Sequence, residues 1–232
     1  MSKEDHIMDS WKLNSRQWVE VVDNNEIASR QLITNRAIME AILAHHPQRV
    51  LDIGCGEGWL TRAIAGEGIE SVGLDGAEVL IEAANKKGIG KFHVLEYKDF
   101  IPEKLATLGQ FDVIVFNYAL FGKEIVEKVL AALRENLRPG GEIIIQTIHP
   151  QHNLVVELTE PTWLKENWAG LDRDFQKGYD WYFRPLKDWK SLFETLPYHW
   201  IKATDICHPE TGDFISIIME VGQDLTSSAA LH

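Results

Sequence analysis

Short apolar runs alternate with longer amphipathic runs between residues 48 and 147. The short runs are almost continuously apolar, as is typical of strands covered on both faces of a sheet. The longer runs repeat apolar residues every three or four positions, which indicates helices. This alternation predicts a parallel sheet with helices on both faces. The predicted strands are 49–53, 71–74, 92–95, 111–117 and 142–147, and the predicted helices are 60–67, 77–87 and 123–137.

The pattern changes on either side of this region. Residues 8–46 predict two or three helices, because apolar residues recur at helical spacing. Residues 151–198 are rich in aromatic residues and show helix-like pieces with few strand-like runs, so we expect an insertion that covers one edge of the sheet. Residues 199–207 and 214–221 predict a closing pair of strands. We therefore expect a single domain over residues 1–232: a helical section (1–47), a ligand-binding core (48–150), a cap (151–198), closing strands (199–222) and a polar tail (223–232).

Charge and cysteine content limit the classes of partner and cofactor that we expect for this chain. The 232-residue chain carries a formal net charge of −12. Such a surface repels phosphate backbones and anionic membranes, so we expect neither a nucleic-acid nor a membrane partner. The two cysteines, Cys55 and Cys207, form no metal or disulfide pattern, and no metal is predicted. An apolar signal core and an apolar run of membrane-spanning length are both lacking, which favours the cytoplasm.

A glycine-rich turn follows the first predicted strand, in the run Asp52-Ile53-Gly54-Cys55-Gly56-Glu57-Gly58. Glycines there let the backbone turn sharply and approach a ligand closely. A dinucleotide fingerprint has the spacing G-x-G-x-x-G, whereas this turn has G-x-G-x-G and Trp59 at the place of the third glycine. A carboxylate at Asp52 suits an ammonium group better than a pyrophosphate. The turn therefore favours a ligand without phosphates.

Further candidate ligand residues follow the next strands. Asp75 ends the second strand, where an acidic side chain can accept hydrogen bonds from ribose hydroxyls. Glu96 and Tyr97 follow the third strand, and Asn117 ends the fourth. Ligands of open α/β sheets bind beyond these carboxyl ends, so we expect the side chains to converge there.

Together these motifs resemble those of class I S-adenosylmethionine (SAM)-dependent methyltransferases. Residues 50–58 match the family's first motif, Gly73-Leu74-Asp75 resembles the second, and Leu137-Arg138-Pro139-Gly140-Gly141 resembles the turn before strand five. The resemblance implies a Rossmann-like, seven-stranded α/β sheet whose last strand is antiparallel, with N-terminal helices and an insertion between strands five and six. It also implies SAM as cofactor, S-adenosylhomocysteine as product, and cofactor contacts from Asp52, Gly54, Cys55, Gly56, Asp75, Gly76, Glu96, Tyr97 and Asn117.

Three residues outside these motifs are weighed against ordinary structural roles. His149, just after strand five, is a candidate general base, or a structural histidine before Pro150. Tyr118 either positions an acceptor or packs. Arg30 either grips the SAM carboxylate or is a solvated helix residue.

The sequence thus predicts an enzyme that transfers a methyl group from SAM to a small acceptor, aromatic or hydroxylated, by in-line displacement. The alternative is a non-catalytic protein that binds SAM or S-adenosylhomocysteine. An NAD-dependent oxidoreductase is a third hypothesis, and the missing third glycine and Asp52 argue against it.

Overall fold

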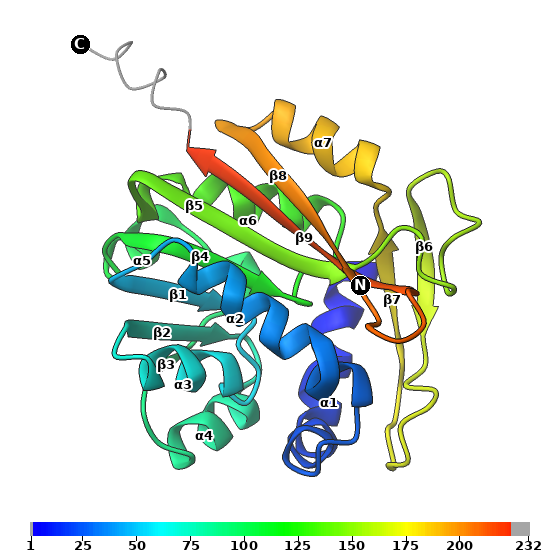
Figure 1. The fold of residues 1–232 in the computed structure, drawn as a ribbon. Helices are drawn as coiled ribbons and strands as arrows, with labels where there is room; N and C mark the ends of the chain where they lie inside the picture. The colour runs from blue at the N-terminus through cyan, green and yellow to red at the C-terminus, as the bar shows by residue number, and fades with distance from the viewer. Residues whose placement is uncertain (1, 224–232) are drawn as a thin grey trace.

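The computed structural model describes residues 2–223 and has a seven-stranded sheet at its centre (Figure 1). The strands are β1 (Arg49–Ile53), β2 (Glu70–Asp75), β3 (Lys91–Val94), β4 (Phe111–Asn117), β5 (Leu137–Ile148), β8 (Tyr198–Cys207) and β9 (Phe214–Gln223). Their order is β3-β2-β1-β4-β5-β9-β8. The first five strands pair in parallel, and β9 is antiparallel to both β5 and β8. The predicted Rossmann-like sheet with an antiparallel last strand is confirmed.

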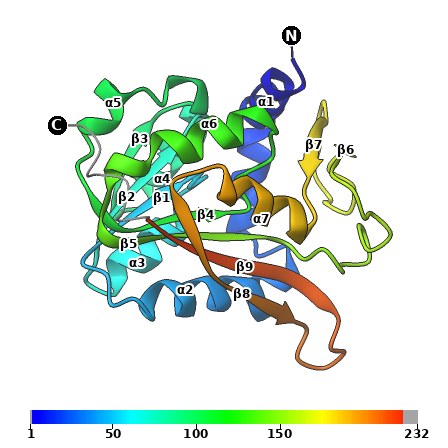
Figure 2. The ribbon, with the colours of Figure 1, turned by 90° about the horizontal axis from the view of Figure 1, so that it is seen from above.

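Helices cover both faces of the sheet (Figure 2). One face carries α2 (Asn35–Leu43) and α3 (Trp59–Gly66), and α4 (Glu78–Lys86) packs beside them on β2 and β3. The other face carries α5 (Pro102–Ala106), α6 (Glu124–Ala132) and α7 (Leu186–Glu194). Successive strand residues point to opposite faces. In β4, Val113 and Val115 therefore pack with α2 and α3, whereas Ile114 and Phe116 pack with α6 and α7.

A long N-terminal helix, α1 (Lys3–Asp23), lies beside the sheet rather than on one of its faces (Figure 2). It begins at a capping box, in which the side chains of Ser2 and Asp5 each accept a hydrogen bond from the other residue's backbone N–H. A π-helical turn, η1 (Arg30–Thr34), follows and leads directly into α2. The expected N-terminal helices are therefore present.

The insertion after β5 differs from its prediction. In place of helix-like pieces alone, it contains a two-stranded antiparallel sheet of β6 (Thr162–Glu166) and β7 (Tyr179–Phe183), followed by α7. In β7, Tyr179, Trp181 and Phe183 point to one side and the intervening residues to the other. The partner strand β6 lies 13–21 residues away in sequence, so local helical spacing was a poor guide. We call residues 151–198 the cap.

Two boundaries also differ from the sequence prediction. The predicted helix 123–137 ends at Ala132, and a 3-10 turn, η3 (Arg134–Asn136), follows it. β5 begins at Leu137, five positions before the predicted start, because the turn at Gly140 (φ +79°) lies within the strand. The predicted tail, 223–232, lies outside the described residues except for Gln223, which ends β9.

Candidate active site

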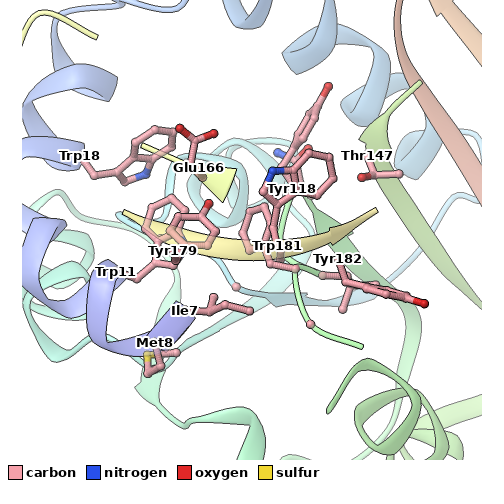
Figure 3. Close-up of a pocket in the computed structure, with 18 of the residues that line it drawn as sticks. Ile7, Met8, Trp11, Trp18, Tyr118, Thr147, Glu166, Tyr179, Trp181 and Tyr182 are labelled. Atoms are coloured by element: carbon pink, nitrogen blue, oxygen red, sulfur yellow. The ribbon is translucent and has the colours of Figure 1, made fainter. Parts of the chain in front are cut away.

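A cavity of about 650 Å³ opens at the carboxyl ends of β1, β2, β4 and β5 (Figure 3). Its floor is the glycine turn after β1 together with the loop after β4. Helix α1 and the β6–β7 hairpin form its roof. The hairpin lies along α1, where the Ser10 hydroxyl donates to the Lys177 carbonyl (2.5 Å) and the Gln176 amide donates to the Asn14 side chain (2.8 Å). The roof is therefore one packed unit.

The glycine turn packs as tightly as its sequence suggests. Gly54 has φ +74°, a conformation that L-residues rarely adopt. A Cβ atom there would lie 2.4 Å from the Cβ of Ala119, in the loop after β4. At Gly56 (φ +59°), a Cβ would lie 3.6 Å from the indole nitrogen of Trp18 on α1. The turn is therefore held between the loop after β4 and the roof, and both glycines line the cavity together with Cys55.

Asp75 joins the glycine turn to the end of β2. Its Oδ2 accepts from the Gly56 amide (3.0 Å), and its Oδ1 accepts from the Ala77 amide (2.8 Å). Burial raises the pKa of this carboxyl, although these backbone N–H bonds oppose the shift. At the neighbouring Gly76, a Cβ would lie 2.6 Å from the Met8 methyl group of α1, so the Met8 side chain packs directly over this glycine. Both residues line the cavity.

Asp52 lies elsewhere than its predicted role requires. Its carboxylate is 1% exposed, accepts a hydrogen bond from the Thr61 hydroxyl (2.7 Å), and does not line the cavity. Burial raises its pKa to about 7. A direct contact with a ligand ammonium, as the sequence suggested, does not agree with this position. The side chain of Asp52 instead ties β1 to α3 beneath the turn.

Glu57 is a carboxylate of the turn for which the sequence predicted no role. Only 1% exposed, it accepts hydrogen bonds from Arg62 (2.8 Å) and Lys87 (2.7 Å), and Lys87 also contacts Asp23 at the end of α1. These contacts tie the turn, α4 and the roof helix together. Arg62 is 5 positions from Glu57 and Lys87 is 30 positions away, so the spacing of the glycine motif could not predict the ion pair with Lys87.

Glu96 and Tyr97, the residues predicted to contact an adenine, both line the cavity. Burial raises the pKa of Glu96, but the hydrogen bonds from Lys12 (2.7 Å) and Lys98 outweigh it and lower the pKa overall. The Tyr97 hydroxyl donates to the carbonyl of Ala119 (3.1 Å). Lys12 belongs to α1, so the roof also closes over this end.

Asn117 and Tyr118 lie at the end of β4, in the middle of the cavity wall. The Asn117 Oδ1 is buried and has no hydrogen-bond donor among residues 2–223. Tyr118 has φ +52°, which is uncommon for a residue with a side chain. Burial raises the pKa of its hydroxyl to about 12, and Ser216 is its hydrogen-bond partner. Asn117 is thus an unmatched acceptor, while the Tyr118 hydroxyl stays protonated at neutral pH.

Arg30 lies over two indoles in the first turn of η1. Its guanidinium carbon is 5.8 Å from the Trp18 ring centre and 5.3 Å from that of Trp59. Within residues 2–223 it forms no ion pair, and burial lowers its pKa. It lines the cavity near Gly56, because Trp18 contacts both. The Arg30 guanidinium, predicted to bind a carboxylate, therefore has no ion-pair partner within the described chain, and Trp18 lines the cavity beside it.

His149 lies outside the cavity, in contrast to its predicted role as a base. Its Nε2 is 3.0 Å from an Asp205 carboxylate oxygen, its Nδ1 accepts from the Gln151 amide (2.9 Å), and its ring stacks on Phe214. All its polar atoms are used in holding the turn after β5 against β8 and β9. This arrangement is that of a structural histidine.

His152 is the histidine that lines the cavity. Its Nδ1 accepts from the Leu154 amide (3.2 Å), so the neutral ring carries its hydrogen on Nε2. Burial lowers its pKa, with a contribution from His149, which keeps it neutral near pH 7. In this tautomer the side chain is a hydrogen-bond donor.

His45 lies close to two carboxylates on one face of the sheet. It lies 2.9 Å from Glu220 and 3.5 Å from Glu142, two residues far away in sequence. Lys202 also contacts Glu220 (3.1 Å). Both imidazole nitrogens face carboxylates, so the contacts are those of an ion-pair cluster on the sheet face beside α2.

Comparisons with known proteins agree with this fold. A methyltransferase-domain family model matches residues 25–199, about three quarters of the chain. The chain therefore belongs to that methyltransferase family, and the resemblance to class I SAM-dependent methyltransferases is confirmed. Within the described residues, no helix combines the length and apolarity needed to cross a bilayer.

Curated relatives match the core of the chain. A ubiquinone biosynthesis O-methyltransferase of Bordetella avium is 33% identical over 104 residues, which cover 44% of this chain and 43% of the relative. Its counterpart in Cereibacter sphaeroides is 35% identical over 118 residues, covering 48% and 45%. The matches therefore span less than half of these relatives.

Solved structures share the fold over a larger part of the chain. A SAM-dependent methyltransferase from Mesorhizobium loti has a TM-score of 0.58 at 18% identity, covering 79% of this chain and 96% of the other. A glycopeptide N-methyltransferase complexed with S-adenosylhomocysteine has a TM-score of 0.60 at 14% identity, covering 80% and 87%. At these identities the likeness concerns the fold.

Proposed function

We propose that this protein is a SAM-dependent methyltransferase that acts on a small acceptor, aromatic or hydroxylated, enclosed beneath α1 and the cap. The observation that carries the proposal is the link between the glycine turn and Asp75, whose carboxylate accepts a hydrogen bond from the Gly56 amide at the edge of the cavity. Family membership and the fold support it.

The residues of the cavity fit SAM from one end to the other. Glu96 and Tyr97 lie at the adenine end, and Asp75 with Gly76 forms the ribose position. At the methionine end, Gly54, Cys55 and Gly56 leave room for a ligand against the backbone. The unmatched Oδ1 of Asn117 would accept from the ammonium group, and the unpaired guanidinium of Arg30 would bind the carboxylate.

The acceptor is expected beyond the methionine end, where aromatic residues of α1 and the cap face the end of β4. The roof over a cavity of about 650 Å³ favours a small acceptor, and the aromatic lining suits a ring. The O-methyltransferase relatives agree with a hydroxylated acceptor.

The residues of the site act mainly by alignment. SAM, when bound, supplies a methyl group on a sulfonium, which is a good leaving group. The side chains of Tyr118 and His152 are a protonated phenol and a donor imidazole, so they orient an acceptor rather than remove its proton. The roof excludes water and holds the acceptor in line with the methyl group. Positioning therefore accounts for catalysis better than a resident base does.

Calorimetry with SAM, S-adenosylhomocysteine and NAD, followed by transfer of labelled methyl groups from SAM in a metabolite extract, tests the proposal. We expect binding of both SAM and its product, and a labelled small molecule. Binding of SAM without transfer to any metabolite would favour the non-catalytic alternative. Tight NAD binding without SAM binding would refute the proposal.

A further inference from the structure

Glu166 is a carboxylate of the cap that lines the cavity and has no cationic partner within residues 2–223. It ends β6, and its Oε1 accepts from the Trp168 amide (2.6 Å). Among residues 2–223 it takes part in no ion pair. The neighbouring Lys165 lies on the opposite face of the hairpin, across from Asp180, whose ion pair is with Lys3. The cap therefore places a carboxylate without an ion-pair partner from the described residues in the cavity wall.

Aromatic rings surround this charge. Tyr179 is the cross-strand partner of Glu166, so their side chains lie on the same face of the hairpin. Burial and the charge of Glu166 both raise the pKa of the Tyr179 hydroxyl. The Trp168 ring centre is 5.5 Å from that of Tyr179 and 4.9 Å from that of Trp11. Figure 3 shows Glu166, Trp18, Trp11 and Tyr179 at one end of the cavity, with Thr147 at the other.

A second observation indicates a polar ligand at this wall. Trp168 is 6% exposed and lines the cavity, and its indole N–H has no acceptor within the described chain. A buried donor of this kind is costly unless a ligand satisfies it. One face of the Trp168 ring is stacked on Phe175 (4.5 Å between ring centres). The wall thus offers aromatic rings and a carboxylate to a cation, and an N–H group to an oxygen atom.

We propose that the acceptor carries an organic ammonium group, which Glu166 pairs with against the rings of Trp11, Trp168 and Tyr179, and an oxygen atom that accepts from the Trp168 indole. Aromatic faces attract alkylammonium groups through the ring quadrupole, and a carboxylate adds charge pairing. This inference rests on the proposed function, because it names the acceptor class of the same site.

Choline and its uncharged analogue 3,3-dimethylbutan-1-ol test the proposal, because they have the same shape and differ in charge. Both are titrated by calorimetry into the full chain saturated with S-adenosylhomocysteine. We expect choline to bind at least tenfold more tightly than the neutral analogue. Glu166→Gln should abolish that preference, because the amide keeps an oxygen for the Trp168 backbone N–H but loses the charge. Trp168→Phe should weaken choline binding several-fold while retaining the preference.

Glu160→Gln is the matched control, since it removes the same charge from an exposed cap residue that pairs with Lys187. It should leave choline binding unchanged. Equal affinity for the two probes, or unchanged choline binding in Glu166→Gln, would overturn the proposal. So would a Glu166→Gln variant that loses affinity for S-adenosylhomocysteine and not for choline, since the cation would then be the donor's own ammonium.

The same experiment gives a different result if the proposed function, rather than the cation subsite, is wrong. A wild-type chain that binds no S-adenosylhomocysteine would refute the SAM assignment. The choline comparison would then be made on the ligand-free chain, where a preference for the charged probe would still support the cation subsite and no preference would overturn it. Thermal melting of each variant checks that the chain is folded.

Discussion

Replacing Gly54 with alanine tests how tightly the glycine turn is held against the loop after β4. A side chain at φ +74° costs about 1–2 kcal/mol by itself. The new Cβ would also lie 2.4 Å from the Ala119 Cβ, and overpacking of this kind costs about 1–3 kcal/mol. Gly54→Ala should therefore lower the free energy of unfolding by about 2–5 kcal/mol.

Gly140→Ala is the matched control, because Gly140 has φ +79° and open space around it. It should cost only the backbone contribution, about 1–2 kcal/mol. Removing the facing methyl group with Ala119→Gly should restore about 1–3 kcal/mol to Gly54→Ala in a double-mutant cycle. Urea unfolding gives the free energies, and calorimetry gives the affinity for S-adenosylhomocysteine, which should fall in Gly54→Ala. Equal destabilisation by Gly54→Ala and Gly140→Ala, or no coupling with Ala119→Gly, would refute the packing argument.

Three further variants test other parts of the site. The pKa of Asp52 is raised from 3.8 to about 7, so its contribution to the free energy of unfolding is full below about pH 4 and is lost as pH rises through 7. This loss is at most about 4 kcal/mol. Asp52→Asn should flatten the pH dependence of stability, as measured by urea unfolding at about pH 4–8. Arg30→Met should weaken binding of S-adenosylhomocysteine about 10- to 100-fold, whereas Arg36→Met, at an exposed residue, should not. Arg184→Met removes hydrogen bonds to the carbonyls of Gly122 (2.9 Å) and Lys123 (2.7 Å). It should therefore destabilise the chain by about 2–4 kcal/mol and speed chymotrypsin cleavage of the cap. An unchanged cleavage rate would show that other contacts hold the cap.

The sheet could be predicted from the sequence because its signals are local. Near-continuous apolar runs mark buried parallel strands, and the glycine turn after β1 and Asp75 after β2 have a fixed spacing that the backbone itself imposes. The structure brings both to the cavity, as expected. Arg30 was recognised as a possible anion-binding group for its chemistry, and its position over Trp18 agrees with that role, which stays a prediction.

The remaining features depend on contacts between distant segments. β6 and β7 form a pair because α1 and the two strands pack together, and no local pattern records that. His149 follows β5 as a cavity residue would, but its orientation is set by Asp205 and Phe214 on other strands. Asp52 belongs to the motif, yet its side chain alternates to the α3 side of the sheet, where Thr61 lies. Position along the chain predicted where these residues lie but not which way they point.

The roof helix has a consequence for the order of kinetic steps. Met8 lies over Gly76 and Trp18 over Gly56, so α1 covers the whole length of the proposed donor position. The Lys12–Glu96 and Lys87–Asp23 contacts hold α1 over this position, and the cap is packed against α1, so the roof should move as one unit when a donor enters or leaves. Turnover should then be ordered, with the donor binding first and its demethylated product leaving last. Steady-state inhibition by S-adenosylhomocysteine should accordingly be competitive with SAM and noncompetitive with the acceptor.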